Sequence, residues 1–258
     1  MKRAGGILAA IGVVLAKFKA LIFPLLKFLP VLLKTGGSMI LMIAIYSWSY
    51  GWMFALGFVV LLFIHECGHL LAAKSFGLKV GAPVFIPFMG AFIALKEAPK
   101  NAWVEAVVGI GGPLLGSLGS LGAYLLYPLT GNPMFAALAY FGFFLNLFNL
   151  APVTPLDGGR IVAALSPWLW LLGLAILLVA FFLWHSLIII LILAFSLPRV
   201  LSLFRQRTPE EVNYFQVPAA RRWAMAFLYF GLAASLGVGM KLIEYDLHRH
   251  ITTAPHVQ

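Results

Sequence analysis

An almost wholly apolar run from Met53 to about Phe76 contains the short sequence H-E-C-G-H, which begins at His65 and ends at His69. A run of this length can cross the roughly 30 Å hydrocarbon core of a bilayer as a helix, and lipid tolerates few other backbone conformations. In a helix, His65 and His69 lie one turn apart on one face, so both imidazoles can reach one Zn²⁺. Glu66 lies beside them, where it can accept a proton from a bound water. The run therefore predicts a helix that carries a zinc site.

The apolar surroundings of this motif make a functional reading more probable than a chance match. H-E-x-x-H is short, and false matches occur in soluble proteins. Two histidines and a glutamate are, however, costly to place in lipid, so by default they mark a site that faces protein or a water-filled cavity. At the rise of a helix, His65 lies about 18 Å beyond Met53, within a core of about 30 Å. We expect a site buried at membrane depth, somewhat nearer the basic end of the helix.

The composition of the whole chain supports a membrane protein. Hydrophobic residues make up 62% of the 258 residues and charged residues 10%, and the mean hydropathy is +1.00. Soluble domains are far more charged than this. The net charge of +10 comes from basic residues at the ends of apolar runs, where they orient spans and contact anionic lipid headgroups. We therefore expect membrane lipids as partners and no nucleic acid.

The pattern of apolar runs predicts an all-α polytopic membrane protein with about six or seven transmembrane helices and a short membrane-embedded β-hairpin. We expect an amphipathic or interfacial segment over 1–36, a core over 37–165, further transmembrane helices over 166–243 with a basic loop at 199–222, and a polar tail over 244–258. Within the core, we expect a motif helix over 53–76, a hairpin over 80–98 and an irregular loop over 149–160. Most lysines and arginines then share one side, which places the N-terminus in the cytoplasm. We expect the cell membrane of a bacterium or an archaeon.

The predicted hairpin lies between two helices, where prolines and glycines exclude a long helix. The β-prone residues 84–86 and 92–95 flank a turn signal at 88–90. Open strand edges are not tolerated in lipid, so the strand Phe92, Ile93, Ala94 and Leu95 must be sheltered by protein or pair with another extended chain.

Several residues predict where the other helices begin and end. Asn101 is a plausible N-cap for a span over about 102–127, whose small residues favour close helix packing. Asn132 and Pro133 precede a span over about 134–150, and the apolar stretch 167–197 allows two short spans with a break near His185. The last span is expected over about 223–242. Glu105 is interpreted as a helix-start charge.

A zinc hydrolase needs a third protein ligand, and the chain contains two aspartates, Asp157 and Asp246. Asp246 stands among polar residues near the C-terminus, so we expect it to be solvated. Asp157 follows an apolar span and precedes two glycines, which permit a tight turn near a ligand. Asp157 is the better candidate, although it could instead be the N-cap of a helix over 158–165. Cys67 points away from the histidine face and is interpreted as a packing residue.

The paired motifs resemble those of the site-2 protease family of intramembrane zinc metalloproteases. They are H-E-x-x-H at 65–69 and N-x-x-P-x-x-P-L-D-G-G at 149–159, and the resemblance covers about 38–165. The resemblance implies one Zn²⁺ per chain, held by His65, His69 and Asp157, with Glu66 as the catalytic base. It also implies that Asn149 binds the substrate or the developing oxyanion, and that the strand at 92–95 aligns an extended substrate.

The function expected from this resemblance is a zinc metalloendopeptidase that cleaves transmembrane segments of membrane proteins within the bilayer. Many family members carry a PDZ or a CBS domain, and we expect neither here, so substrate selection would depend on the membrane part or on a separate regulatory protein. The alternatives are a zinc transporter and a non-catalytic homologue that only binds membrane segments. Glu66 argues against both, because neither requires a general base beside the first ligand.

Overall fold

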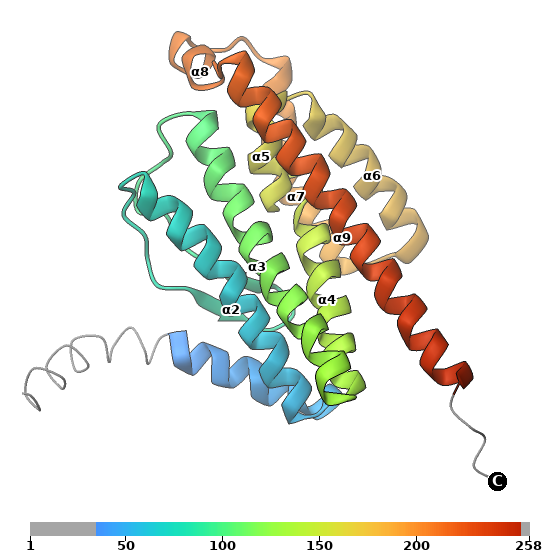
Figure 1. Ribbon diagram of the computed structural model, residues 1–258. Coiled ribbons are helices and arrows are strands. Elements are labelled where there is room, and N and C mark those ends of the chain that lie inside the picture. Colours follow the sequence, from blue (N-terminus) through green and yellow to red (C-terminus); the bar gives the residue numbers. More distant parts are fainter. Residues whose placement is uncertain (1–34, 254–258) are drawn as a thin grey trace, which may run out of the picture.

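The computed structural model describes residues 35–253, so most of the expected interfacial segment 1–36 lies outside the described residues. The described chain is mostly helical (Figure 1). A helical segment over 35–50 is followed by α2 (Trp52–Ser75), β1 (Val84–Ile86), β2 (Gly90–Phe92), α3 (Ala102–Thr130), α4 (Pro133–Asn149), α5 (Asp157–Leu165), α6 (Leu169–Trp184), α7 (Leu187–Leu201), a 3₁₀ turn (Ser202–Phe204), α8 (Pro209–Tyr214) and α9 (Ala219–Thr253).

Four helices in the described part of the chain are long and apolar enough to cross a bilayer. They cover Trp52–Ser75, Ala102–Thr130, Leu187–Phe204 and Ala219–Arg249, and the shorter apolar helices are α4 and α6. This composition fits a multi-pass integral membrane protein, as predicted. The expected count of six or seven spans requires the shorter helices to cross as well, and that count stays a prediction.

The centre of the fold is the packing of α2 against α3, with α4 on the other side of α3 (Figure 1). The two backbones approach closely at two glycines. A Cβ atom on Gly68 of α2 would overlap the carbonyl oxygen of Gly111, and a Cβ on Gly111 of α3 would lie 2.6 Å from the carbonyl oxygen of Gly68. Small residues permit such an approach, as predicted for α3. The approach turns the histidine face of α2 toward α3 and the start of α5.

Most predicted helix boundaries are confirmed. The side chain of Asn101 accepts a hydrogen bond from the backbone N–H of Val104 at 3.0 Å, and that of Asn132 caps α4 through Met134 at 3.0 Å. His185 separates α6 from α7 in a left-handed conformation with φ of 49°. The last helix is longer than predicted, because α9 continues through the polar residues 244–253. The prediction ended the span with its apolar residues and therefore did not include this extension.

The hairpin forms, but its second strand is shorter than predicted. β1 and β2 pair antiparallel, with Val84 opposite Phe92, and only Phe92 of the predicted strand 92–95 lies in β2. Beyond β2 the chain continues to pair. Ala94 accepts a hydrogen bond from the N–H of Gly81 at 2.8 Å, and Lys96 donates to the carbonyl of Lys79 at 2.9 Å. Beyond the two strands, the pairing of the hairpin is therefore limited to an isolated antiparallel bridge between Val80 and Leu95.

The segment 35–50 holds the hairpin in place through three hydrogen bonds. Thr35 Oγ1 donates to the carbonyl of Pro83 at 2.9 Å, and the hydroxyl of Ser38 accepts from the N–H of Phe85 at 3.2 Å. The hydroxyl of Tyr46 accepts from the N–H of Phe88 at 3.0 Å. These bonds satisfy backbone groups at the start of β1 and at the turn. The residues of β2, on the other edge of the hairpin, line a cavity.

A candidate metal centre in an apolar cavity

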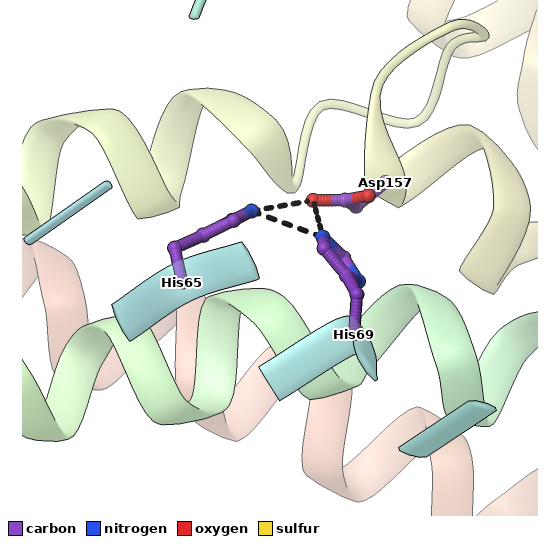
Figure 2. A group of neighbouring side chains, drawn as sticks. All are labelled: His65, His69 and Asp157. Carbon is purple, nitrogen blue, oxygen red and sulfur yellow. Dashed lines mark hydrogen bonds and ion pairs between the residues drawn. The ribbon is translucent and has the colours of Figure 1, made fainter. Parts of the chain in front are cut away.

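Three donor atoms from α2 and α5 converge at the centre of the fold (Figure 2). The Nε2 atoms of His65 and His69 lie 3.0 Å apart, and each lies 3.2 Å from Oδ2 of Asp157. The three residues are 3%, 8% and 9% exposed. The sequence spacing predicted the histidine pair, and the fold brings Asp157 to it from 88 positions further along the chain than His69.

The hydrogen bonds behind the imidazoles determine which ring nitrogens carry protons. Nδ1 of His69 lies 2.7 Å from the carbonyl oxygen of Val108, which can only accept, so Nδ1 donates. Nδ1 of His65 lies 2.7 Å from Oδ1 of Asn146, whose amide nitrogen donates to the carbonyl of Gly142 at 2.7 Å. The amide is thereby fixed with its oxygen toward His65. In the neutral imidazoles, both Nε2 atoms therefore present lone pairs.

With both imidazoles neutral, three lone pairs meet here, and a bound cation would stabilise such a group. Three ligand atoms around a tetrahedral Zn²⁺ lie roughly 3.3 Å from one another, close to the spacing of the donors here. Only a glycine at position 112 of α3 leaves room for the two imidazoles. A Cβ there would overlap Nε2 of His69 and lie 2.7 Å from Nε2 of His65. The donor set, its spacing and its supporting hydrogen bonds fit Zn²⁺.

Asp157 does not cap α5. It is the first residue of the helix, Leu156 occupies the N-cap position, and no side chain makes a cap hydrogen bond there. The alternative of a capping aspartate is therefore wrong, because the carboxylate faces the two imidazoles instead of the helix N–H groups. Cys67 stands outside the three-donor group, in agreement with a packing role.

Glu66 lies beside this group and is 3% exposed. Its Oε2 atom is buried and has no hydrogen-bond partner among the described residues. A buried carboxylate oxygen without a partner is costly, and such groups occur where a catalytic residue awaits water or substrate. Glu66 can therefore exchange a proton with a molecule that enters beside the three donors.

The donors and Glu66 open into a cavity of about 520 Å³. Its wall includes Asn149, and the predicted contact of this residue with a substrate stays a prediction. Three of the four residues in the predicted strand also line it, namely Phe92, Ile93 and Leu95. Ala94 is not among the lining residues, and its carbonyl pairs with Gly81 within the hairpin. The far wall is apolar and comes from α7 and α4, with Ile188, Leu191, Ile192, Phe195, Phe144 and Phe148.

Two acidic residues have partners that the sequence did not suggest. Glu105 is 8% exposed and accepts two hydrogen bonds from Arg199, at 3.0 and 2.9 Å, and one from Tyr214 at 2.6 Å. It is therefore part of a partly buried ion pair as well as a helix-start charge. Asp246 accepts a hydrogen bond from the hydroxyl of Tyr124 on α3.

Comparison with known proteins identifies similar chains. Residues 53–131 match the family model described as Peptidase family M50. The chain is 33% identical over 117 residues to zinc metalloprotease MJ0392 of Methanocaldococcus jannaschii, covering 41% of this chain and 33% of that protein. It is 29% identical over 123 residues to the putative zinc metalloprotease sll0528 of Synechocystis, covering 46% of this chain and 32% of that protein. The matches thus span about a third of the length of these curated relatives.

Among solved structures, the chain is similar to a site-2 protease from Methanocaldococcus jannaschii. The similarity covers 66% of this chain and 88% of the other, with 24% sequence identity and a TM-score of 0.42.

Proposed function

We propose that this chain, whose residues 53–131 match the model of peptidase family M50, is a zinc metalloprotease that cleaves peptide bonds in membrane-spanning segments of other proteins. The observation that carries the proposal is the convergence of three metal-binding lone pairs beside a buried glutamate oxygen without a partner. This group opens into an apolar cavity large enough for a few residues of an extended chain.

His65, His69 and Asp157 would hold the zinc ion, and a bound Zn²⁺ supplies an acidified water and polarises a carbonyl oxygen. Glu66 accepts the proton that the attacking water loses and delivers it to the leaving amine. Asn149 lies in the same wall, where its amide can donate a hydrogen bond to the substrate or to the developing oxyanion. The apolar wall excludes bulk water from these steps.

A substrate helix hides its carbonyl groups in its own hydrogen bonds, so it must unwind before it can be cut. We propose that the unwound segment pairs with the edge formed by Ile93 and Leu95. Ala94 and Lys96 use their backbone groups inside the hairpin, and backbone groups alternate in direction along an extended chain. The groups of Ile93 and Leu95 therefore face the other way, toward the cavity that these residues line.

We also propose that the chain crosses the membrane six or seven times with its N-terminus in the cytoplasm. The end of α2, the start of α3 and α8 lie together at the top of Figure 1. The lysines at 74, 79, 96 and 100 and the arginines at 199, 205 and 207 belong to these ends and connections. An excess of lysine and arginine is typical of the cytoplasmic side.

Zinc transport is the competing function, and it requires several ligand groups along a path. The part of the chain that the structure describes holds one group of three close metal-binding side chains. A general base adjacent to this group has no role in transport, so hydrolysis accounts for more of the site.

The test compares wild type with Glu66→Gln in liposomes, measuring bound zinc and cleavage of a panel of single-span proteins in the same samples. We expect about one zinc per chain in both and cleavage only by wild type. Glu97→Gln is the matched control, because Glu97 is 49% exposed and pairs with Lys79 outside the cavity. Zinc flux without cleavage by any of the three proteins would overturn the proposal in favour of transport.

A further inference from the structure

Arg160 lies in the wall of the cavity that contains Glu66 and the three donors. It follows Asp157 by three residues in α5, so the two side chains lie on neighbouring turns of one helix face. Its stem packs at α3, where a Cβ on Gly109 would lie 3.2 Å from the Cβ of Arg160. The proposed reaction leaves this residue without a role.

Arg160 has no hydrogen bond or salt bridge to any residue that the structure describes. Two other arginines of the fold differ in this respect, since Arg199 binds Glu105 and Arg205 binds Glu211. A guanidinium carries five donors and stays charged, so an arginine in the wall of a largely apolar cavity requires an acceptor.

The charges around Arg160 do not supply that acceptor. Within the cavity, the ionisable groups facing it are Glu66 and the three donor residues, and Asp157 is already engaged by the two imidazoles. Outside the cavity, Arg160 also interacts electrostatically with Tyr214, whose hydroxyl donates to Glu105, and Glu105 is paired with Arg199. With Zn²⁺ in place, the two carboxylates of the cavity offset the ion, and the charge of Arg160 remains uncompensated. The rest of the wall is largely apolar.

We propose that Arg160 binds a carboxylate of the substrate, and that it thereby selects substrates with an acidic group close to the cleaved bond. The planar guanidinium matches a carboxylate with two parallel hydrogen bonds, and in an apolar cavity such a pair is strong. This inference rests on the proposed protease function, because it assumes that the ligand of the cavity is a peptide chain.

The direction of α5 indicates on which side of the cleaved bond the carboxylate of the substrate lies. From Asp157, α5 runs toward the end of the molecule where α6 begins and α8 lies (Figure 1). Arg160 therefore binds a group on the part of the substrate that lies between the cleaved bond and this basic end. The carboxylate is either an acidic side chain or the free carboxyl terminus of a substrate that has already been shortened.

The experiment measures binding separately from cleavage. The dissociation constants of single-span peptides are determined with Glu66→Gln protein in detergent. The peptides carry Glu, Gln or Lys at one position, on the side of the cleaved bond that lies toward the basic end of the protein. A second pair has a neutral side chain there and ends in a free or an amidated carboxyl group. We expect Arg160→Gln to weaken binding of peptides with a carboxylate about tenfold, and binding of neutral peptides less than twofold. Whichever pair responds identifies the source of the carboxylate.

Two further variants keep the outcome interpretable. Arg160→Glu is expected to reverse the preference, so that the Lys peptide binds better than the Glu peptide. Arg222→Gln, which removes an exposed arginine of α9 outside the cavity, is expected to change no dissociation constant. Unchanged zinc content in each variant excludes misfolding.

Failure of this inference and failure of the protease function give different results. If Arg160→Gln weakens all peptides equally, or none, while wild type cleaves, the carboxylate site is overturned and the protease function stands. If wild type cleaves nothing but binding still depends on Arg160 and on the carboxylate, the carboxylate site stands and the protease function is overturned.

Discussion

Nδ1 of His65 lies 2.7 Å from Oδ1 of Asn146, and this contact joins α2 to α4 behind the candidate metal centre. Asn146 fixes which nitrogen of His65 carries the proton, because its own amide group is held by Gly142. Loss of a residue that hydrogen-bonds to a metal-binding histidine typically lowers metal affinity by about 10–100-fold. We expect Asn146→Leu to weaken zinc binding by about that factor, measured by competition with a chelator of known affinity.

Asn149→Leu is the matched control for this prediction. Asn149 lies three residues further along the chain and lines the cavity, but it makes no hydrogen bond to the donor residues. We expect its zinc affinity to equal that of wild type while cleavage is slower. Equal zinc affinity in Asn146→Leu and wild type would show that the contact does not orient His65.

The close approach of α3 to the donors predicts a second effect. A Cβ on Gly112 would overlap Nε2 and Cε1 of His69, and both belong to a ring held at its other side by Val108. Because the ring cannot move without losing that bond, we expect Gly112→Ala to abolish both stoichiometric zinc binding and cleavage. The measurement is zinc content by elemental analysis after purification.

Gly122→Ala in the same helix provides the comparison. A Cβ at Gly122 meets no atom within 4 Å, so the substitution tests helix propensity alone. We expect full zinc content and a stability equal to wild type or higher by about 0.5–1 kcal/mol. Full zinc content in Gly112→Ala as well would refute the steric explanation.

The ion pair of Glu105 and Arg199 ties the start of α3 to the end of α7. Glu105 is buried, and Arg199 also lies over the ring of Trp170, 4.9 Å from its centre. Removal of Arg199 leaves a buried carboxylate with one remaining partner, Tyr214. We expect Arg199→Ala to destabilise the protein by about 3 kcal/mol, measured by reversible unfolding in mixed micelles. Arg222→Ala, at an exposed position, should change stability by less than about 0.5 kcal/mol.

Tyr214 gives this cluster a pH dependence. Burial and the neighbouring Glu105 carboxylate raise the pKa of the Tyr214 hydroxyl above its ordinary value. A raised pKa means that the folded state favours the protonated phenol, so its stabilisation is complete below the unfolded pKa of about 10 and is lost as pH rises beyond it. We expect the stability difference between wild type and Tyr214→Phe to be constant from pH 7 to about 9 and to shrink above about pH 10. A difference that grows above pH 10 would contradict this.

The parts of the site that the sequence predicted are those encoded by local spacing or by residue chemistry. His65 and His69 share a face because they are one turn apart, and Asp157 stood out as the aspartate that follows an apolar span. The supporting contacts could not be predicted in this way. His65 and Asn146 are 81 residues apart and Glu105 and Arg199 are 94 apart, so their pairing depends on how the helices pack.

The same reasoning explains why the partners of two acidic residues were not predicted. Glu105 and Asp246 stand in locally polar or helix-start sequence, which is typical of solvated charges. Both become partners of tyrosines or arginines because of neighbouring helices, α7 and α8 for Glu105 and α3 for Asp246. The sequence did indicate that Asn146 needs a partner, because it is an amide within an apolar helix. It did not indicate that the partner is His65.

The edge of the hairpin predicts the effect of a proline at Leu95. Ala94 and Lys96 hold the hairpin together through Gly81 and Lys79, and the N–H of Leu95 has no partner among the residues that the structure describes, so it is available to pair with a substrate. Proline removes that N–H and keeps the preceding residue extended, which is tolerated at a strand edge. We expect Leu95→Pro to slow cleavage at least about tenfold with unchanged zinc content, because an unwound substrate loses a backbone hydrogen bond where water is scarce. Leu95→Ala, which keeps the N–H, should retain most of the activity, and the hydrogen bond between Lys96 and Lys79 should stay protected from exchange in both variants. If Leu95→Pro cleaves as fast as Leu95→Ala, substrates do not pair with this edge, and the hairpin acts only as a wall of the cavity.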